Sequence, residues 1–148
     1  MEIRTEKKLV ERDVYTYIAE DGKEFDTKVD CENYEREIED ARLRAGAERF
    51  EIKELEDTYP LDVDGQYISD NHSYKWYKVK NEEELKVVAE VYNRSDDWNK
   101  LKAYPEVICV EYDDYWDNDA WMYLLSDMKK ATDSFWRKHG FEVEFKER

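Results

Sequence analysis

The stretch EVICVEYDDYWDNDAWMYLLSDMKKATDSFWRKHGFEVEF, residues 106–145, decides the fold because three periodic patterns follow one another in it. Residues 106–112 alternate between apolar and polar side chains, which predicts a strand. Residues 121–136 keep a helical spacing of apolar side chains, and Phe141, Val143 and Phe145 alternate again after Gly140. We therefore expect a strand, an acidic loop, a helix and a second strand in this order.

The expected helix has one apolar face, which we predict to be buried as the main core element. The residues on this face are Trp121, Leu124, Leu125, Met128, Thr132, Phe135 and Trp136. Asp117, Asn118 and Asp119 are N-cap candidates, and basic residues precede Gly140, where the helix dipole favours them. Both ends of the helix are predicted in this way.

The first 52 residues predict a ribbon, a helix and a short strand. A strand is expected over residues 9–19, and Asp21-Gly22 is typical of a tight turn into residues 23–25. Thr27 with Asp30 resembles a capping box at the start of a helix that Gly46 is expected to end. The apolar stripe of this helix is Tyr34, Ile38, Ala41 and Ala45. Phe50 and Ile52 then indicate a short strand.

The middle of the chain predicts a second unit of strand and helix. Residues 59–71 contain Pro60, Gly65 and several aspartates and are expected to be an exposed loop. Residues 73–80 are rich in strand formers, and Asn81 with Glu84 caps a helix striped by apolar side chains. Residues 93–105 connect this helix to the next strand and carry enough apolar bulk to be packed down.

The predicted fold class is α+β. Aromatic residues number 22 among the 148, which argues against disorder although 43% of the residues are charged. Helices and strands are interspersed, and the first two strands form a hairpin, so we expect one domain over residues 1–148. Its sheet would be mixed or mostly antiparallel, with about three helices packed on it. A doubly wound parallel sheet is the alternative, but only residues 107–110 are as apolar as its strands would require.

Two features of the sequence bear on the compartment. No apolar run reaches the length of about 18 residues that a membrane helix needs, and the first residues do not begin a signal peptide. The expected location is the cytoplasm, that of the host cell if the protein is phage-encoded. Cys31 and Cys109 are far apart in the sequence and are expected to be buried free thiols.

The sequence predicts no catalytic residue. His72 is expected in a polar loop and His139 at a helix end, neither is expected to have a partner, and no Ser or Cys stands beside them in an arrangement for nucleophilic catalysis. The four glycines are isolated, which excludes a phosphate-binding glycine-rich loop. We therefore expect no enzyme activity and no cofactor.

A metal site is not predicted either. The segment Asp62-Val63-Asp64-Gly65 lacks the other ligands of an EF-hand loop. The aspartates at 113, 114, 117 and 119 could chelate a hard cation, but an acidic surface explains them more simply.

The charge of the chain is unevenly distributed. The formal net charge is −15, and residues 51–127 hold 20 acids and 8 bases, a net of −12. This charge disfavours direct binding to nucleic acid, which needs clustered Lys and Arg, and favours basic partners. Residues 111–119 contain five acids, no base and three interleaved aromatics.

A resemblance to a class of proteins adds to this reading. It is carried by VYTYIAEDGKEF at 14–25, DCENYE at 30–35, YKWY at 74–77 and NEEEL at 81–85. These segments, within the first 95 residues, resemble small acidic accessory proteins encoded by phages and prophages of Gram-positive bacteria. Such proteins include anti-CRISPR and anti-restriction inhibitors, some of which mimic the charge of DNA. The resemblance implies a non-enzymatic inhibitor and assigns no residue.

The functional hypothesis is a DNA-mimic-like surface that binds a basic site on a nucleic-acid-handling host protein. Its predicted residues are Glu111, Asp113, Asp114, Tyr115, Trp116, Asp117 and Asp119. One alternative is a protein that sequesters a small nucleotide signal, with Arg94 beside Trp98 or Arg137 beside Trp136. Another is a metal-dependent phosphate-handling enzyme. Binding to a membrane is not expected, and a homodimer is left open.

Overall fold

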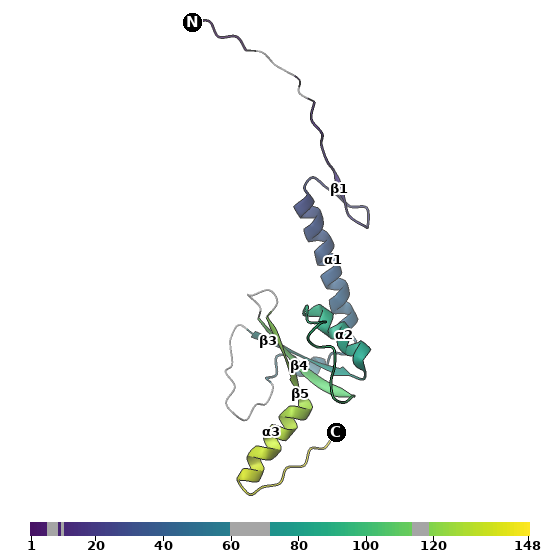
Figure 1. Cartoon of the computed structure of the whole chain (residues 1–148), viewed down its shortest axis with the longest axis vertical. Helices are drawn as coiled ribbons and strands as arrows, with labels where there is room; N and C mark the ends of the chain where they lie inside the picture. The colour runs from purple at the N-terminus through teal and green to yellow at the C-terminus, as the bar shows by residue number, and fades with distance from the viewer. Residues whose placement is uncertain (6–8, 10, 60–71, 114–118) are drawn as a thin grey trace. The chain divides into compact units, whose positions relative to one another are not determined.

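The structure is a computed structural model that describes residues 1–5, 9, 11–59, 72–113 and 119–148. The chain divides into two compact units, residues 1–40 and 41–148, and the division falls within helix α1 (Lys28–Glu48). The other elements, in chain order, are β1 (Tyr17–Ile18), β2 (Glu24–Phe25), the short 3-10 helix η1 (Lys53–Leu55), β3 (His72–Val79), α2 (Glu82–Val91), β4 (Glu106–Asp113), β5 (Ala120–Leu124) and α3 (Leu125–Lys138) (Figure 1).

The first unit joins a small hairpin to the first turns of α1. Strands β1 and β2 pair antiparallel, and Gly22 takes the turn position with a φ of +89°, which a residue without a Cβ adopts at little cost. The Thr27 hydroxyl accepts a hydrogen bond from the Asp30 amide, as the capping box predicts. The Phe25 ring packs on the Tyr34 ring at 5.1 Å between centroids. The hairpin is thereby attached to the helix.

The second unit is built on a three-stranded antiparallel sheet in the order β3-β4-β5. Residues 50–57 run along the outer side of β3, where the Ile52 amide donates to the Trp76 carbonyl and the Lys78 amide donates to the Phe50 carbonyl. The short strand expected at Phe50 and Ile52 is therefore a single bridge, between Glu51 and Tyr77.

One face of this sheet holds the larger core. Helix α2 packs on it, with Leu85, Val88 and Ala89 completely buried. The sheet contributes Tyr77, Val79, Ile108, Val110 and Ala120, α1 contributes Ala47, and Trp98 closes the core from the connection between α2 and β4. As predicted, that connection is packed down.

The opposite face of the sheet is covered by shorter pieces. Its buried side chains are Tyr74, Trp76 and Cys109 together with Met128 of α3, and Ile52 and Leu55 pack at their side. Helix α3 contacts β4 and β5, and η1 contacts β3. This second face carries the polar residues described in the next subsection.

The predicted class is confirmed: the structure is α+β, and the described residues form three α-helices and antiparallel sheets of two and three strands. The Asn81 side chain accepts from the Glu84 amide at 2.9 Å and caps α2, as expected. Cys31 and Cys109 are buried free thiols, also as expected. The prediction of one domain over residues 1–148 stays a prediction.

The predicted start of the last helix is wrong. Residues 120–124 form β5 and pair with β4, and the helix begins only at Leu125. In place of the N-cap expected at Asp117, Asn118 or Asp119, the Glu106 carboxylate accepts hydrogen bonds from the amide and the hydroxyl of Ser126. A carboxylate from a neighbouring strand thus supplies the negative charge at the positive end of the helix dipole.

The predicted burial of the apolar face at residues 121–136 is also wrong in large part. Trp121 and Trp136 are 43% and 41% exposed, and Met128 is the only buried residue of α3. The main core lies on the other side of the sheet, under α2.

Three further boundaries differ from the prediction. Residues 141–145 form no strand, and in the described part of the expected strand at residues 9–19 only Tyr17–Ile18 is a strand. Helix α1 continues through Gly46 to Glu48, because the final turn buries Ala47 in the core. The expected loop falls mostly outside the described residues, at 60–71, and Tyr59 at its start is exposed.

No helix in the described ranges combines the length and the apolar composition that crossing a membrane would require.

Candidate functional site

Alternation along the three strands places a group of polar and aromatic side chains on one face of the sheet. In the β3–β4 register His72 lies opposite Asp113 and Tyr74 lies opposite Glu111. In the β4–β5 register Trp121 lies opposite Glu111, and Tyr123 is two residues farther along the same strand. Side chains two residues apart on a strand share a face, so all these groups meet at one end of the sheet.

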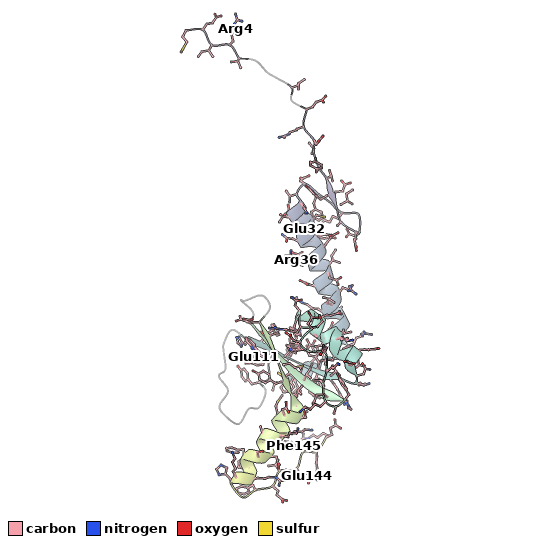
Figure 2. The ribbon with its side chains drawn as sticks, viewed as in Figure 1. Arg4, Glu32, Arg36, Glu111, Glu144 and Phe145 are labelled. Carbon is pink, nitrogen blue, oxygen red and sulfur yellow. The ribbon has the colours of Figure 1, made fainter. Side chains whose placement is uncertain are left out.

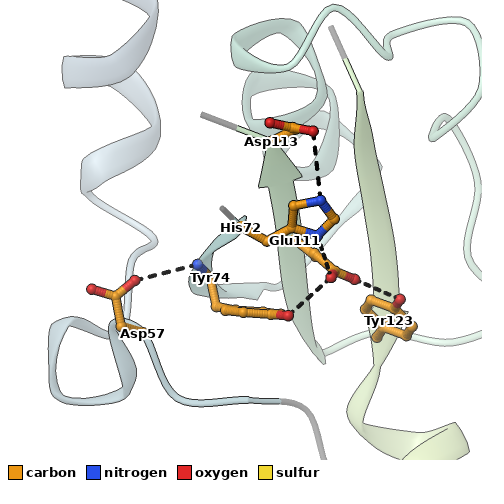
Figure 3. Close-up of polar contacts among 6 residues, drawn as sticks. All are labelled: Asp57, His72, Tyr74, Glu111, Asp113 and Tyr123. Atoms are coloured by element: carbon orange, nitrogen blue, oxygen red, sulfur yellow. Dashed lines mark hydrogen bonds and ion pairs between the residues drawn. The ribbon is translucent and has the colours of Figure 1, made fainter. Parts of the chain in front are cut away.

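Glu111 is the centre of this group (Figure 3). Its carboxylate accepts hydrogen bonds from Tyr74 Oη at 2.9 Å and from Tyr123 Oη at 2.7 Å, and it lies 2.7 Å from His72 Nδ1. The residue is only 5% exposed, and it is the one buried charged residue in the described part of the chain. A buried carboxylate needs such partners, because its charge is costly to remove from water.

The environment of Glu111 keeps its carboxyl group ionised. Burial alone would raise the pKa of Glu111, but the hydrogen bonds from His72, Tyr123 and Tyr74 outweigh this effect and lower the pKa below its ordinary value. Burial, together with the bond to Glu111, raises the pKa of Tyr74. The tyrosine hydroxyls therefore act as neutral donors to a charged acceptor.

His72 connects Glu111 to the end of β4. Its Nδ1 faces Glu111, and its Nε2 lies 3.6 Å from the Asp113 carboxylate. The ring also stacks on the indole of Trp121, with centroids 5.3 Å apart. The imidazole ring therefore lies between the carboxylates of Glu111 and Asp113, within hydrogen-bond distance of the first.

A second set of contacts fixes Tyr74 from the side of residues 57–59. The Asp57 carboxylate accepts from the Tyr74 amide at 3.4 Å, and the Asp57 amide donates to the Tyr74 carbonyl at 2.9 Å (Figure 3). The ring of Tyr59 meets that of Tyr74 edge to face, and the Trp76 indole donates to the Thr58 carbonyl. The segment before residue 60 is thus anchored to β3.

The arrangement is better suited to holding strands together than to chemistry. Three donors from β3 and β5 already engage the two oxygens of Glu111, so the carboxylate links these strands to β4. Burial raises the pKa of the nearby Cys109 thiol to about 12, so the thiol is not a nucleophile at neutral pH. Over the described ranges, no three metal-ligating side chains are grouped in a way that could hold a metal ion.

The structure distributes the predicted partner-binding residues among different environments. Glu111 is buried, and Asp113 is partly buried beside His72, so Glu111 does not present its charge at a surface. Asp119 is exposed, and its carbonyl accepts from the Asp113 amide. The other four predicted residues, Asp114, Tyr115, Trp116 and Asp117, lie outside the described residues.

Sequence reasoning missed His72, Tyr74 and Tyr123. The prediction that His72 lies in a polar stretch without a partner is wrong, because His72 begins β3 and faces Glu111. A usable signal was present: Tyr74 and Trp76 alternate with His72, so all three share one face if the strand predicted at residues 73–80 begins one residue earlier. What the sequence does not contain is the register that sets them opposite Glu111.

The two arginines of the nucleotide-binding alternative both lie beside carboxylates. Arg94 is 3.3 Å from Asp97, and Arg137 is 2.8 Å from Asp133. Trp98 is buried in the core, and Trp136 packs edge to face on Phe141.

A more exposed acidic surface lies on the first unit. Residues 20–32 of the hairpin and of the start of α1 hold six acids and two bases, and every one of these acids is exposed. Glu32 and Arg36 project from the helix (Figure 2), and the Glu32 carboxylate lies 3.5 Å from Lys28 Nζ. The other base, Lys23, lies 4.2 Å from the centroid of the Tyr34 ring. We call residues 20–32 the acidic segment.

Comparisons of the chain with protein-family models, with curated proteins and with solved structures find no match.

Proposed function

We propose that the protein is a non-enzymatic acidic binding protein that occupies a basic surface of a protein which normally handles nucleic acid. The observation that carries this proposal is that all six acids of the acidic segment are exposed, against only two bases. Duplex DNA presents one charge for about every 1.7 Å of its axis, and a close set of carboxylates reproduces part of that field. Such complementarity mainly accelerates association and selects the partner.

The buried network around Glu111 supports a non-enzymatic protein, because its polar side chains already bind one another. The most reactive side chains of the described sheet, Glu111 and His72, are engaged with one another and with two tyrosines. The resemblance to phage accessory proteins makes a host defence protein such as a nuclease the expected kind of target, with the host cytoplasm as the place of action. Glu111 is left out of the proposed interface because it is buried.

The test is a binding measurement with two matched charge reversals. The first variant is Glu24→Lys with Asp26→Lys, in the acidic segment, and the second is Asp114→Lys with Asp117→Lys, in the run predicted from the sequence. Tagged protein is used to retain basic proteins from host lysate at low and high salt, and the association rate of each retained protein is then measured. We expect the first variant to slow association and to weaken its dependence on salt.

The outcomes show whether the acidic segment or the run at residues 113–119 forms the interface. An effect of the second variant alone would move the interface to residues 113–119. Retention that is equal for both variants and the wild type, or absent at low salt, would mean that the acids only make the surface soluble. Circular dichroism of both variants is the control for folding.

A further inference from the structure

Strand β1 is shorter than the sequence predicts, and the strand-forming residues directly before it have no ladder partner in the described part of the chain. A strand is expected over residues 9–19, but of the described residues there only Tyr17–Ile18 is one. Val14, Tyr15 and Thr16 favour strands, yet they form neither helix nor strand. Val14 and Tyr15 are 82% and 67% exposed. A strand-forming segment is therefore exposed at the start of the hairpin.

The hairpin leaves one edge of β1 open among the described residues. The Ala19 amide donates to the Lys23 carbonyl, so these two residues form a hydrogen-bonded pair. Tyr17 and Phe25, two residues farther along in the same register, form the next such pair. Backbone groups alternate along a strand, so those of Tyr17 point to β2 and those of Ile18 point away from it. Outside the β1–β2 ladder, no backbone hydrogen bond of the described residues uses Ile18.

An added strand would lengthen β1 towards the N-terminus. In an extended segment alternate residues direct their backbone groups to the same side, so Thr16 and Val14 would present theirs at the edge used by Ile18. A two-stranded ribbon is at most marginally stable alone, and a third strand supplies a further ladder. The addition of an extended segment to an exposed sheet edge is a recurring mode of protein recognition.

Contacts with α1 hold the hairpin in place without using this edge. Tyr34 Oη donates to the Asp21 carboxylate at 2.6 Å, and the Glu20 amide donates to the Glu35 carboxylate at 3.0 Å. Lys23 Nζ lies over the Tyr34 ring. All of these residues belong to the first unit, and those of the hairpin lie in its turn. The turn is thus anchored to the helix, and the outward backbone groups of β1 stay available.

The charges around the open edge are mostly negative. Residues 14–19 carry no charge, whereas residues 13–26 hold five acids and one base, Lys23. Glu24 lies opposite Ile18 in the register, and both residues are exposed. Edge strands of natural proteins are commonly protected from pairing by charged side chains, especially lysine. A hairpin that bears these acids complements a lysine-protected edge in charge, whereas a second copy of the same hairpin would be repelled.

We infer that the open edge of β1, continued into residues 14–16, adds as a strand to a lysine-bearing sheet edge of the partner protein. The inference rests on the proposed function and deepens it, because it states how the basic surface of the partner is engaged. Main-chain hydrogen bonds hold the two edges together, and the acids of the hairpin select an edge of opposite charge.

A synthetic hairpin peptide of alternating lysine and valine is the probe for this edge. The same peptide with glutamate in place of lysine is its control. NMR titration of the full chain at low salt should show binding of the lysine peptide, with slower hydrogen exchange at the amides of Thr16 and Ile18. The glutamate peptide should not bind, because like charges would face one another.

Two proline variants of equal charge test the backbone contact. Thr16→Pro removes a donor at the open edge, so the lysine peptide should bind about tenfold more weakly. Tyr15→Pro removes an amide that points to the other side of the segment, so its affinity for the peptide should match that of the wild type. The amide chemical shifts of β2 check that both variants keep the hairpin.

The failure of this inference can be told apart from that of the proposed function. A lysine peptide that does not bind, or that binds Thr16→Pro as tightly as the wild type, overturns strand addition. Retention of a basic host protein from lysate tests the proposed function. If the wild type and Thr16→Pro retain that protein equally, but Glu24→Lys with Asp26→Lys does not, the proposed function stands and strand addition is excluded.

Discussion

At the scale of single residues, Glu111 differs from most of the 39 acids of the chain in being enclosed by the protein. Most carboxylates contribute to the electrostatic field around the molecule, but this one joins three strands. Tyr74 and His72 reach it from β3, and Tyr123 reaches it from β5. Removing the carboxylate would leave these donors without an acceptor at a site with little access to water.

This environment predicts a pH dependence of stability. The pKa of Glu111 is lower in the folded protein than its ordinary value of 4.5, so the unfolded chain takes up the proton first as the pH falls. The stabilisation from the ionised form is complete above about pH 4.5 and is lost as the pH falls through the folded pKa. Urea unfolding of the wild type and of Glu111→Gln should show a difference in free energy that shrinks below this pH.

The control for this experiment is Asp119→Asn, because the Asp119 side chain is exposed, whereas Glu111 is buried. A difference between wild type and Glu111→Gln that grows on acidification would contradict the assigned direction of the pKa change.

Residue patterns predicted part of this site and missed the rest for a physical reason. The sequence placed Glu111 on a strand by its alternation, but the same five-acid run suggested that the residue is exposed. Whether a carboxylate on a two-sided strand faces water depends on the register of its neighbours, which local sequence does not contain. The tyrosines that satisfy it lie 37 and 12 residues away in the chain.

At the scale of elements, β5 and α3 show where periodicity fails. Residues 120–124 are Ala, Trp, Met, Tyr and Leu, an apolar run that fits a helix face as well as a two-sided strand. Pairing with β4 selects the strand. The elements predicted correctly, β3, α2 and β4, have clear alternation or a local cap such as Asn81, and they need no distant partner to be recognised.

This difference between elements predicts which substitutions destabilise the fold most. Leu85 of α2 is completely buried, so Leu85→Ala should lower the free energy of unfolding by about 2–5 kcal/mol. Trp121 is larger, but it is 43% exposed and loses mainly its stack on His72, so Trp121→Ala should cost less. The urea midpoints of the two variants, compared at equal m-value, show which substitution lowers the free energy of unfolding more. A greater cost for Trp121→Ala would place the main core on the β5 side of the sheet.

At the scale of the whole molecule, charge is the dominant property. A net charge of −15 on 148 residues opposes compaction by self-repulsion. The described pairs Lys28–Glu32 and Lys53–Glu48 have side chains that are all more than half exposed, and exposed pairs contribute about 0–1 kcal/mol each. Repulsion among the acids therefore outweighs local attraction in the dependence of stability on salt.

Moderate salt should accordingly stabilise the protein. The Debye length falls from about 30 Å at 0.01 M to about 8 Å at 0.15 M ionic strength, which screens repulsion between carboxylates that are not in contact. The melting temperature should rise over this interval, and equally in sodium and potassium chloride, because screening does not depend on the identity of the cation. The Glu24→Lys and Asp26→Lys variant changes the net charge from −15 to −11 and should show a smaller rise. A melting temperature that falls with salt would mean that the acids are mostly paired, and would require the acidic segment to be stabilised by its few bases.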